Sequence, residues 1–359
     1  MTDPTRTPRV AALDLSDPSQ TLAVLLAGGA GTRLHELSAL EAKPALPLAG
    51  RRLADFACAA ASGAGLTRLH AVLGPRPDTL ARHLREVWGD AFALSLHDAQ
   101  PGGTVSSLSR CLDGEPAREI LVLAADQVHA LPLSDLLRAH REAGARATLA
   151  TPTDEPGQHG PVVLDAAALR DAPADADGDL WADLLPVFAA RGDLALWRPP
   201  QGIYWRDVDT LDDVRAVSLD FQGTPPCALP RAETAPRSPL EDEDGRALAF
   251  EVAGLRLSAP RFGARERGRW TMIEDSVVLP TARVAPGARL SRAVVAPGAI
   301  VPANLVVGED PGEDARWFRV TPGGTTLITA AMLATRAAER MRAQFGGRLP
   351  GLVTPRAPG

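Results

Sequence analysis

LAVLLAGGAGTRL, residues 22–34, is an apolar run that leads directly into a glycine-rich turn and an arginine. A short apolar run bounded by glycines is typical of a strand buried on both faces of a parallel sheet. Glycines in the turn let backbone N–H groups converge on an anion without interference from Cβ atoms. No Gly-Lys-Ser/Thr follows, and Leu34 stands where a dinucleotide fingerprint needs its last glycine. The stretch therefore predicts a buried strand ending in an anion-binding turn.

The only lysine of the chain, Lys43, follows ten residues after Arg33 in the segment AKPA, residues 42–45. Every other one of the 38 basic residues is an arginine. Lysine is a compact point charge, whereas arginine is a wide planar fork, so a lysine kept here indicates a position that arginine does not fill. The alternative is chance, because a single lysine has to fall somewhere. We interpret the turn, Arg33 and Lys43 together as a cradle for a polyphosphate.

The composition excludes several classes of protein. A chain of 359 residues with 45% hydrophobic residues can form one large and one smaller domain. The net charge of −6 and dispersed arginines argue against a nucleic-acid partner. Three isolated cysteines and seven histidines show no metal-binding spacing, so no zinc site is predicted and the histidines are assigned surface or capping roles. No signal peptide or membrane-length apolar run is found, and a cytoplasmic location is expected.

The first two thirds of the chain alternate short apolar runs with helical patterns. We expect helices to be capped by Asp78 and Ser134 and the second of them to end at Gly144. Such alternation predicts an α/β fold with a doubly wound, mostly parallel, Rossmann-like sheet, whose ligands bind at the carboxyl ends of the strands. The predicted strands are 22–27, 70–73, 119–125 and 147–151, and the predicted helices are 51–63, 78–87 and 133–143.

The last third of the chain has a hexad pattern. Val278, Val284 and Leu290 recur every six residues, a second set follows after a shift of two, and the turn Ala-Pro-Gly-Ala occurs twice. This favours a short parallel β-helix over an ordinary sandwich. The predicted domains are a flexible extension 1–20, an α/β domain 21–221, a linker 222–246 rich in proline and acidic residues, a β-helix domain 247–335, and a C-terminal helix and tail 336–359.

Two aspartates are candidate metal ligands. Asp126 follows the strongest later strand directly and is therefore expected at the ligand edge of the sheet. Asp207 lies in the segment YWRDV, residues 204–208, which contains the only tyrosine of the chain. Mg²⁺ is typically held by one or two carboxylates and phosphate oxygens. A turn or helix-cap role is the alternative for each aspartate alone, but two carboxylates beside a phosphate cradle fit phosphoryl or nucleotidyl transfer.

With these motifs in place, the chain resembles the ADP-glucose pyrophosphorylase (glucose-1-phosphate adenylyltransferase) family over residues 21–335, as a shortened and divergent member. The resembling segments occur in the family's order. They are LAGGAGTRL at 26–34, AKPAL at 42–46, DFA at 55–57, GGT at 102–104, LAAD at 123–126, YWRDVDT at 204–210, and EDARWFR at 313–319 leading into GGTTLIT.

The resemblance implies a nucleotidyltransferase domain followed by a left-handed β-helix. It implies transfer of adenylyl from ATP to glucose 1-phosphate, giving ADP-glucose and pyrophosphate for glycogen or α-glucan synthesis. Arg33, Lys43 and Asp126 would be catalytic, and Asp126 and Asp207 would bind Mg²⁺. A homo-oligomer, or a hetero-oligomer with a competent paralogue, is implied as well. The implied nucleotide-binding residues are Leu26, Ala27, Gly28, Gly29, Gly31, Thr32, Gly103 and Thr104.

The sequence also departs from that family on the sugar side. The family's lysine that holds the sugar phosphate has no counterpart, because Lys43 is the only lysine, so an arginine such as Arg146, Arg170 or Arg198 would have to replace it. The span between Thr151 and Leu184 is short, which indicates the loss of one sugar-binding strand. The alternative function is therefore a non-catalytic regulatory or structural subunit that keeps the nucleotide pocket.

Overall fold

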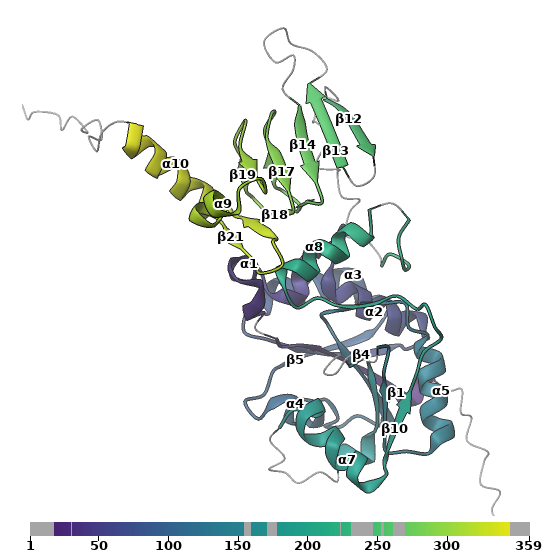
Figure 1. Ribbon diagram of the computed structural model, residues 1–359. Helices are drawn as coiled ribbons and strands as arrows, with labels where there is room; N and C mark the ends of the chain where they lie inside the picture. The colour runs from purple at the N-terminus through teal and green to yellow at the C-terminus, as the bar shows by residue number, and fades with distance from the viewer. Residues whose placement is uncertain are drawn as a thin grey trace, which may run out of the picture. The chain divides into compact units, whose positions relative to one another are not determined.

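The computed structural model describes residues 18–29, 31–153, 159–170, 178–222, 224–230, 247–252, 255–260 and 270–344 (Figure 1). The chain forms two compact units, the first from residues 1–29 and 54–205 and the second from 30–53 and 206–359. Most of the predicted extension, much of the linker and the end of the tail lie outside the described residues. The predicted domain boundaries therefore stay a prediction.

The first unit is built on a seven-stranded sheet with the order β10-β8-β9-β6-β1-β4-β5. Neighbouring strands are parallel except at β9, which is antiparallel to both β6 and β8. This confirms the predicted α/β fold with a mostly parallel sheet, and β1 occupies the interior position expected for its apolar sequence. The strands are β1 Thr21–Ala27, β4 Arg68–Leu73, β5 Ala93–Asp98, β6 Glu119–Ala124, β8 Ala147–Ala150, β9 Val162–Asp165 and β10 Leu194–Trp197.

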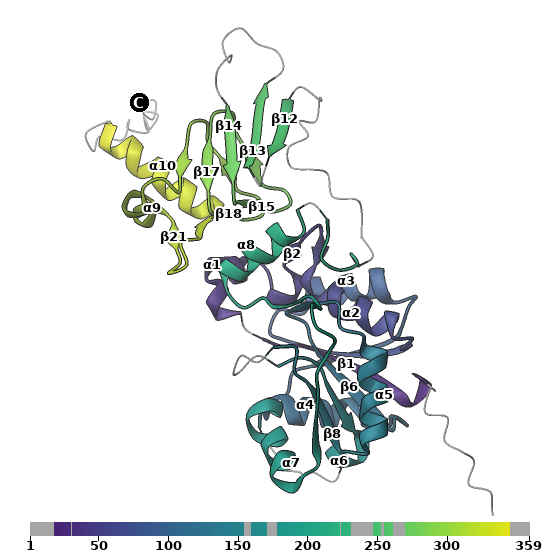
Figure 2. The ribbon, with the colours of Figure 1, turned by 45° about the vertical axis from the view of Figure 1, so that its right-hand side comes forward.

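Helices cover both faces of this sheet. Residues of α4, α6, the short η4 and α7 pack with Leu22 and Val24 of β1 in one hydrophobic core. In both views α5 lies on the opposite side of the sheet from α4 and α7 (Figure 2). The helices are α2 Leu53–Gly63, α3 Asp78–Trp88, α4 Gly103–Cys111, α5 Leu133–Ala143, α6 Ala166–Arg170, η4 Leu180–Leu184 and α7 Leu185–Arg191.

Two of the predicted helix caps are wrong. Pro77 and Pro132 occupy the N-cap positions of α3 and α5, and neither helix has a side-chain cap hydrogen bond. Asp78 and Ser134 lie inside the first turns instead, where Asp78 can still interact favourably with the helix dipole. The predicted end of α5 is confirmed, because Gly144 has the left-handed φ of 60° that favours glycine.

The second unit contains the parallel β-helix predicted from the hexads, which the family resemblance implied to be left-handed. Its three faces are formed by β14, β17 and β20, by β15, β18 and β22, and by β16 and β19, each paired in parallel. Met272 pairs with Arg289 and Arg289 with Val306, so one coil takes seventeen residues rather than three full hexads. That difference of one residue accounts for half of the two-residue shift in the hexad pattern. The strands are β14 Thr271–Glu274, β15 Val277–Val278, β16 Arg283–Val284, β17 Arg289–Ser291, β18 Ala293–Val295, β19 Ile300–Val301, β20 Val306–Val307 and β22 Thr326–Ile328.

The second unit joins an early segment of the chain to its C-terminal part. Glu36 of α1 accepts a hydrogen bond from Arg319 of β21 at 2.6 Å. Asp212 of α8 accepts from Thr321 at 2.9 Å and from Thr325 at 2.5 Å. The remaining elements are η2 Thr32–Leu34, α1 Glu36–Leu40, η3 Lys43–Ala45, β2 Pro47–Leu48, β3 Arg51–Arg52, α8 Leu211–Asp220, β12 Ala247–Val252, β13 Leu255–Pro260, α9 Pro311–Trp317, β21 Arg319–Val320 and α10 Ala330–Gln344.

None of the helices among the described residues is both long enough and apolar enough to span a membrane.

Two glycines of the β-helix provide a test of its close packing. A Cβ atom at Gly308, whose φ is +94°, would lie 2.2 Å from the carbonyl oxygen of Ser291, whereas Gly298, with φ +74°, has nothing within 4 Å. We expect Gly308→Ala to lower the free energy of unfolding by about 3 kcal/mol or more, from overpacking added to backbone strain. Gly298→Ala, the control, should cost only about 1 kcal/mol. Urea denaturation followed by circular dichroism measures both, and equal losses would contradict the close approach.

Candidate functional site

The predicted glycine turn begins where β1 ends. Leu26 and Ala27 are the last residues of the strand, and Gly28 and Gly29 follow. The backbone is tightly packed here, since a Cβ atom at Gly74 would lie 2.9 Å from the carbonyl oxygen of Gly28. The turn therefore lies at the carboxyl edge of the sheet, the side on which ligands bind in folds of this kind.

Gly103 and Thr104, predicted to line the nucleoside, are the first two residues of α4. Gly103 has φ +91°, and a Cβ atom there would lie 2.6 Å from the carbonyl oxygen of Gly178. The Thr104 hydroxyl accepts a hydrogen bond from the N–H of Leu180 at 2.6 Å and donates to Asp179 at 3.4 Å. The hydroxyl is thus used to hold residues 178–180, so any contact of this segment with a nucleoside would come from its backbone or from the methyl group of Thr104.

Asp126 lies between β6 and the short strand β7 (Gln127–His129) and is partly buried. Its neighbour Gln127 donates from Nε2 to the carbonyl oxygen of His159 at 2.6 Å. The Gln127 Oε1 atom is buried and has no hydrogen-bond partner among the described residues. Buried polar atoms are nearly always paired, so this unpaired acceptor next to Asp126 in the sequence is unusual. On the same strand, burial lowers the pKa of His129 to about 4, which keeps that imidazole neutral.

Within the second unit, Arg33 and Lys43 converge on one carboxylate. Lys43 Nζ lies 2.6 Å from Asp209 Oδ1, and an Arg33 guanidinium nitrogen lies 2.7 Å from Asp209 Oδ2. The Lys43 side chain is only 6% exposed, whereas that of Arg33 is 66% exposed. Gly31 permits this approach, because its φ is +63° and a Cβ atom there would lie 3.0 Å from Lys43 Cβ. The two predicted cations are thus held together by an aspartate.

Asp209 was missed by the sequence prediction, which selected Asp207 two residues earlier. Asp207 is the last residue of β11 (Trp205–Asp207), and its carboxylate lies within 4.8 Å of that of Asp209. The signal was present, because residues i and i+2 of an extended segment point to the same side. The backbone of Asp209 is held in place, because its N–H donates to the Asp213 carboxylate at 3.1 Å. Asp213 also belongs to the capping box of α8.

One candidate for the sugar phosphate is already engaged. An Arg170 nitrogen donates to the carbonyl oxygens of Glu115 and Ala117 at 2.8 Å and 3.4 Å. This arginine therefore helps to hold the chain near the start of β6. All three arginines proposed from the sequence, Arg146, Arg170 and Arg198, remain predictions.

The predicted surface or capping role of the histidines is wrong for most of them. His70, His83, His129 and His140 are buried, with at most 6% of each residue exposed. They are tolerated inside because they have polar partners: His83 lies 2.6 Å from Asp55, and His140 lies 2.8 Å from Thr148.

The class of protein follows from two family models that match in chain order. Residues 22–172 match the nucleotidyl transferase model, and residues 264–328 match the GlmU-like C-terminal hexapeptide model. A crystal structure described as a glucose-1-phosphate thymidylyltransferase from Bacillus anthracis is similar in fold, with a TM-score of 0.50 and 14% identity, over 56% of this chain and 96% of that one. The chain is thus a nucleotidyl transferase domain joined to a hexapeptide-repeat domain.

The chain also has relatives that match over nearly its whole length. The glucose-1-phosphate adenylyltransferase of Thiobacillus denitrificans is 27% identical over 413 aligned positions, covering 91% of this chain and 94% of that protein. The protein of the same name from Bradyrhizobium diazoefficiens is 29% identical, covering 88% of this chain and 96% of the relative. The chain is thus similar over nearly its whole length to proteins named glucose-1-phosphate adenylyltransferase, which agrees with the resemblance that its motifs indicated.

Proposed function

We propose that this protein transfers the adenylyl group of ATP to glucose 1-phosphate, giving ADP-glucose and pyrophosphate, and that it does so in the cytoplasm. The observation that carries the proposal is the convergence of Arg33 and Lys43 on Asp209, with Gly31 packed against Lys43. Phosphoryl-group chemistry depends mainly on positioning and on neutralising charge, which is what a pair of fixed cations supplies. The names of the full-length relatives point to the same reaction.

The reaction forms one bond and breaks another at the α-phosphorus of ATP. A phosphate oxygen of glucose 1-phosphate attacks this phosphorus, and the bond to the bridging oxygen of the β-phosphate breaks, so that pyrophosphate leaves with its electron pair. The glycine turn with Thr32 would bind the phosphates, and Gly103 and Thr104 would line the nucleoside. Arg33 and Lys43 would neutralise the charge that develops on the leaving pyrophosphate.

We propose Asp126 and Asp207 as ligands of one Mg²⁺ ion. Carboxylates suit this hard cation. In the first unit Asp126 is partly buried just after β6, and in the second unit the carboxylate of Asp207 lies within 4.8 Å of that of Asp209. When bound, Mg²⁺ would neutralise phosphate charge and orient the α-phosphate. Through its ion pair with Lys43, Asp209 would keep the Lys43 ammonium in place while substrate is absent.

The absent sugar-phosphate lysine favours a second candidate, a non-catalytic subunit that binds ATP and assembles with a competent paralogue through the β-helix domain. Losing one charged partner of a phosphate costs roughly 2–5 kcal/mol, which slows turnover by about 30-fold to 5,000-fold. The retained glycine turn, Arg33, Lys43 and both aspartates favour the first candidate. A homo-oligomer is proposed with the first candidate and a hetero-oligomer with the second.

A pyrophosphate-release assay on the purified chain separates the two candidates. With ATP, glucose 1-phosphate and Mg²⁺ we expect pyrophosphate and ADP-glucose in equal amounts, and none when the sugar phosphate is left out. ATP binding is measured in parallel by calorimetry. Tight ATP binding with no turnover would overturn the catalytic proposal and support the non-catalytic subunit, whereas absence of both would overturn each of them.

A further inference from the structure

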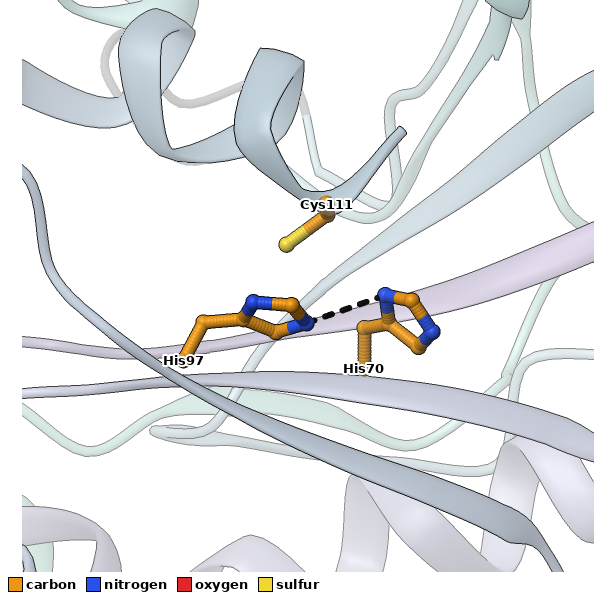
Figure 3. Close-up of side chains that lie close together, drawn as sticks. All are labelled: His70, His97 and Cys111. Atoms are coloured by element: carbon orange, nitrogen blue, oxygen red, sulfur yellow. Dashed lines mark hydrogen bonds between the residues drawn. The ribbon is translucent and has the colours of Figure 1, made fainter. Parts of the chain in front are cut away.

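Two histidines and a cysteine, far apart in sequence, meet on one face of the central sheet. His70 lies on β4, His97 on β5, and Cys111 is the last residue of α4. The register of β4 and β5 pairs His70 with Ser95 and Val72 with His97, so both histidines point to the same face. Figure 3 shows the Cys111 sulfur directed from the end of α4 toward the two imidazole rings.

The separations among these side chains suit a single metal ion. His97 Nε2 lies 3.1 Å from His70 Nδ1, and one nitrogen of each ring and the Cys111 sulfur all lie within 4.8 Å of one another. Two nitrogens bound to one tetrahedral zinc at about 2.0–2.1 Å would be about 3.3 Å apart. Only a small adjustment would therefore convert the contact between the rings into joint coordination.

An acidic residue fixes the orientation of His70. Glu115 Oε1 lies 3.2 Å from His70 Nε2, and Glu115 is itself held by Arg68 at 2.9 Å. A carboxylate that accepts the N–H of one ring nitrogen leaves the lone pair on the other, here Nδ1, which faces His97. Histidines that bind metals generally have such a carboxylate or carbonyl on their outer nitrogen.

We propose that His70, His97 and Cys111 bind one thiophilic divalent cation, of which Zn²⁺ is the natural example, with solvent as the fourth ligand. A mixed nitrogen and sulfur set selects Zn²⁺ over Mg²⁺, so this site is chemically different from the aspartate set proposed for catalysis. Cys111 is buried and His97 only partly so, which leaves the His97 side for solvent.

The bound ion would link β4 and β5 to the end of α4, the helix that begins with Gly103 and Thr104. The alternative to metal binding is that the two imidazoles only share a hydrogen bond. Burial raises the pKa of the Cys111 thiol to about 12, so the metal-free sulfur carries a proton that metal binding would release to solvent.

Cobalt titration of the full chain, stripped of metal with a chelator, tests the site. Co²⁺ should bind in one equivalent and produce a near-ultraviolet charge-transfer band from the cysteine thiolate, and Zn²⁺ should remove that band. Cys111→Ser should abolish the band. Cys58→Ser, which alters another fully buried cysteine, should leave it unchanged. Glu115→Gln should weaken Zn²⁺ affinity by about 10–100-fold without removing the band.

Two further variants show whether loss of the band reflects misfolding of Cys111→Ser or the separate metal site proposed at the aspartates. Asp126→Asn should retain the band, which separates this site from the aspartates. His97→Gln alters the most accessible ligand, so it provides the answer if Cys111→Ser does not fold. A wild-type protein that gives no thiolate band, or a band that survives both Cys111→Ser and His97→Gln, would overturn the proposal and leave a hydrogen-bonded histidine pair.

Discussion

Replacing Asp126 by asparagine is expected to reduce pyrophosphate release by about 10²–10³-fold, the usual effect of losing one electrostatic contact to the transition state. Asparagine keeps the shape of the side chain but has no charge, and Mg²⁺ prefers carboxylates. Asp126 follows β6 at the carboxyl edge of the sheet, so the substitution should act on the site and little on the fold. Initial rates at saturating ATP and varied Mg²⁺ provide the measurement.

The matched control is Asp135→Asn in the same unit. Asp135 lies in the first turn of α5, 41% exposed, in an ion pair with Arg138. Exposed pairs of this kind contribute little, so turnover and stability should remain close to those of the unaltered chain. If Asp126→Asn retained full turnover with an unchanged Mg²⁺ requirement, Asp126 could not be a ligand of the catalytic metal.

Local features of the fold were predictable because their cause lies within a few neighbouring residues. The apolar run before Gly28 requires burial on both faces, and the structure places it as β1 in the interior of the sheet. Gly144 ends α5 because a left-handed residue is needed there. In contrast, α3 and α5 start one residue after a proline, and the cap residues Asp78 and Ser134 were misassigned by one or two positions.

Features produced by strand register could not be predicted in the same way. His70 and His97 are 27 residues apart, and only the pairing of β4 with β5 brings them to one face. Sequence spacing therefore gave no sign of a cluster. The seventeen-residue coil is similar: the pairing of strands in successive coils defines it, and the sequence shows only an irregularity in the hexads. Asp209 differs from these, because its alternation with Asp207 could have been noticed.

The second large expected effect is a loss of stability when the contact between Lys43 and Asp209 is removed. Lys43 is 6% exposed and Asp209 26% exposed, and their charged atoms are 2.6 Å apart. Asp209→Asn removes the carboxylate next to a buried ammonium, and we expect a loss of about 3 kcal/mol in the free energy of unfolding. Lys43→Met should cost less, because Asp209 keeps its contact with Arg33 and is partly solvated. Urea denaturation of both variants measures the difference.

A double-mutant cycle distinguishes the interaction energy of Lys43 with Asp209 from the individual effects of the two substitutions. The variant with both changes should be destabilised by about 1–3 kcal/mol less than the sum of the single variants, because the contact is lost only once. The same cycle on the exposed pair Asp135 and Arg138, 41% and 65% exposed, should give a coupling below about 0.5 kcal/mol. If the coupling between Lys43 and Asp209 were also below about 0.5 kcal/mol, the pair would not hold the ammonium in place. Lys43 would then be free to contact phosphate without first leaving an aspartate, and its burial would need another cause.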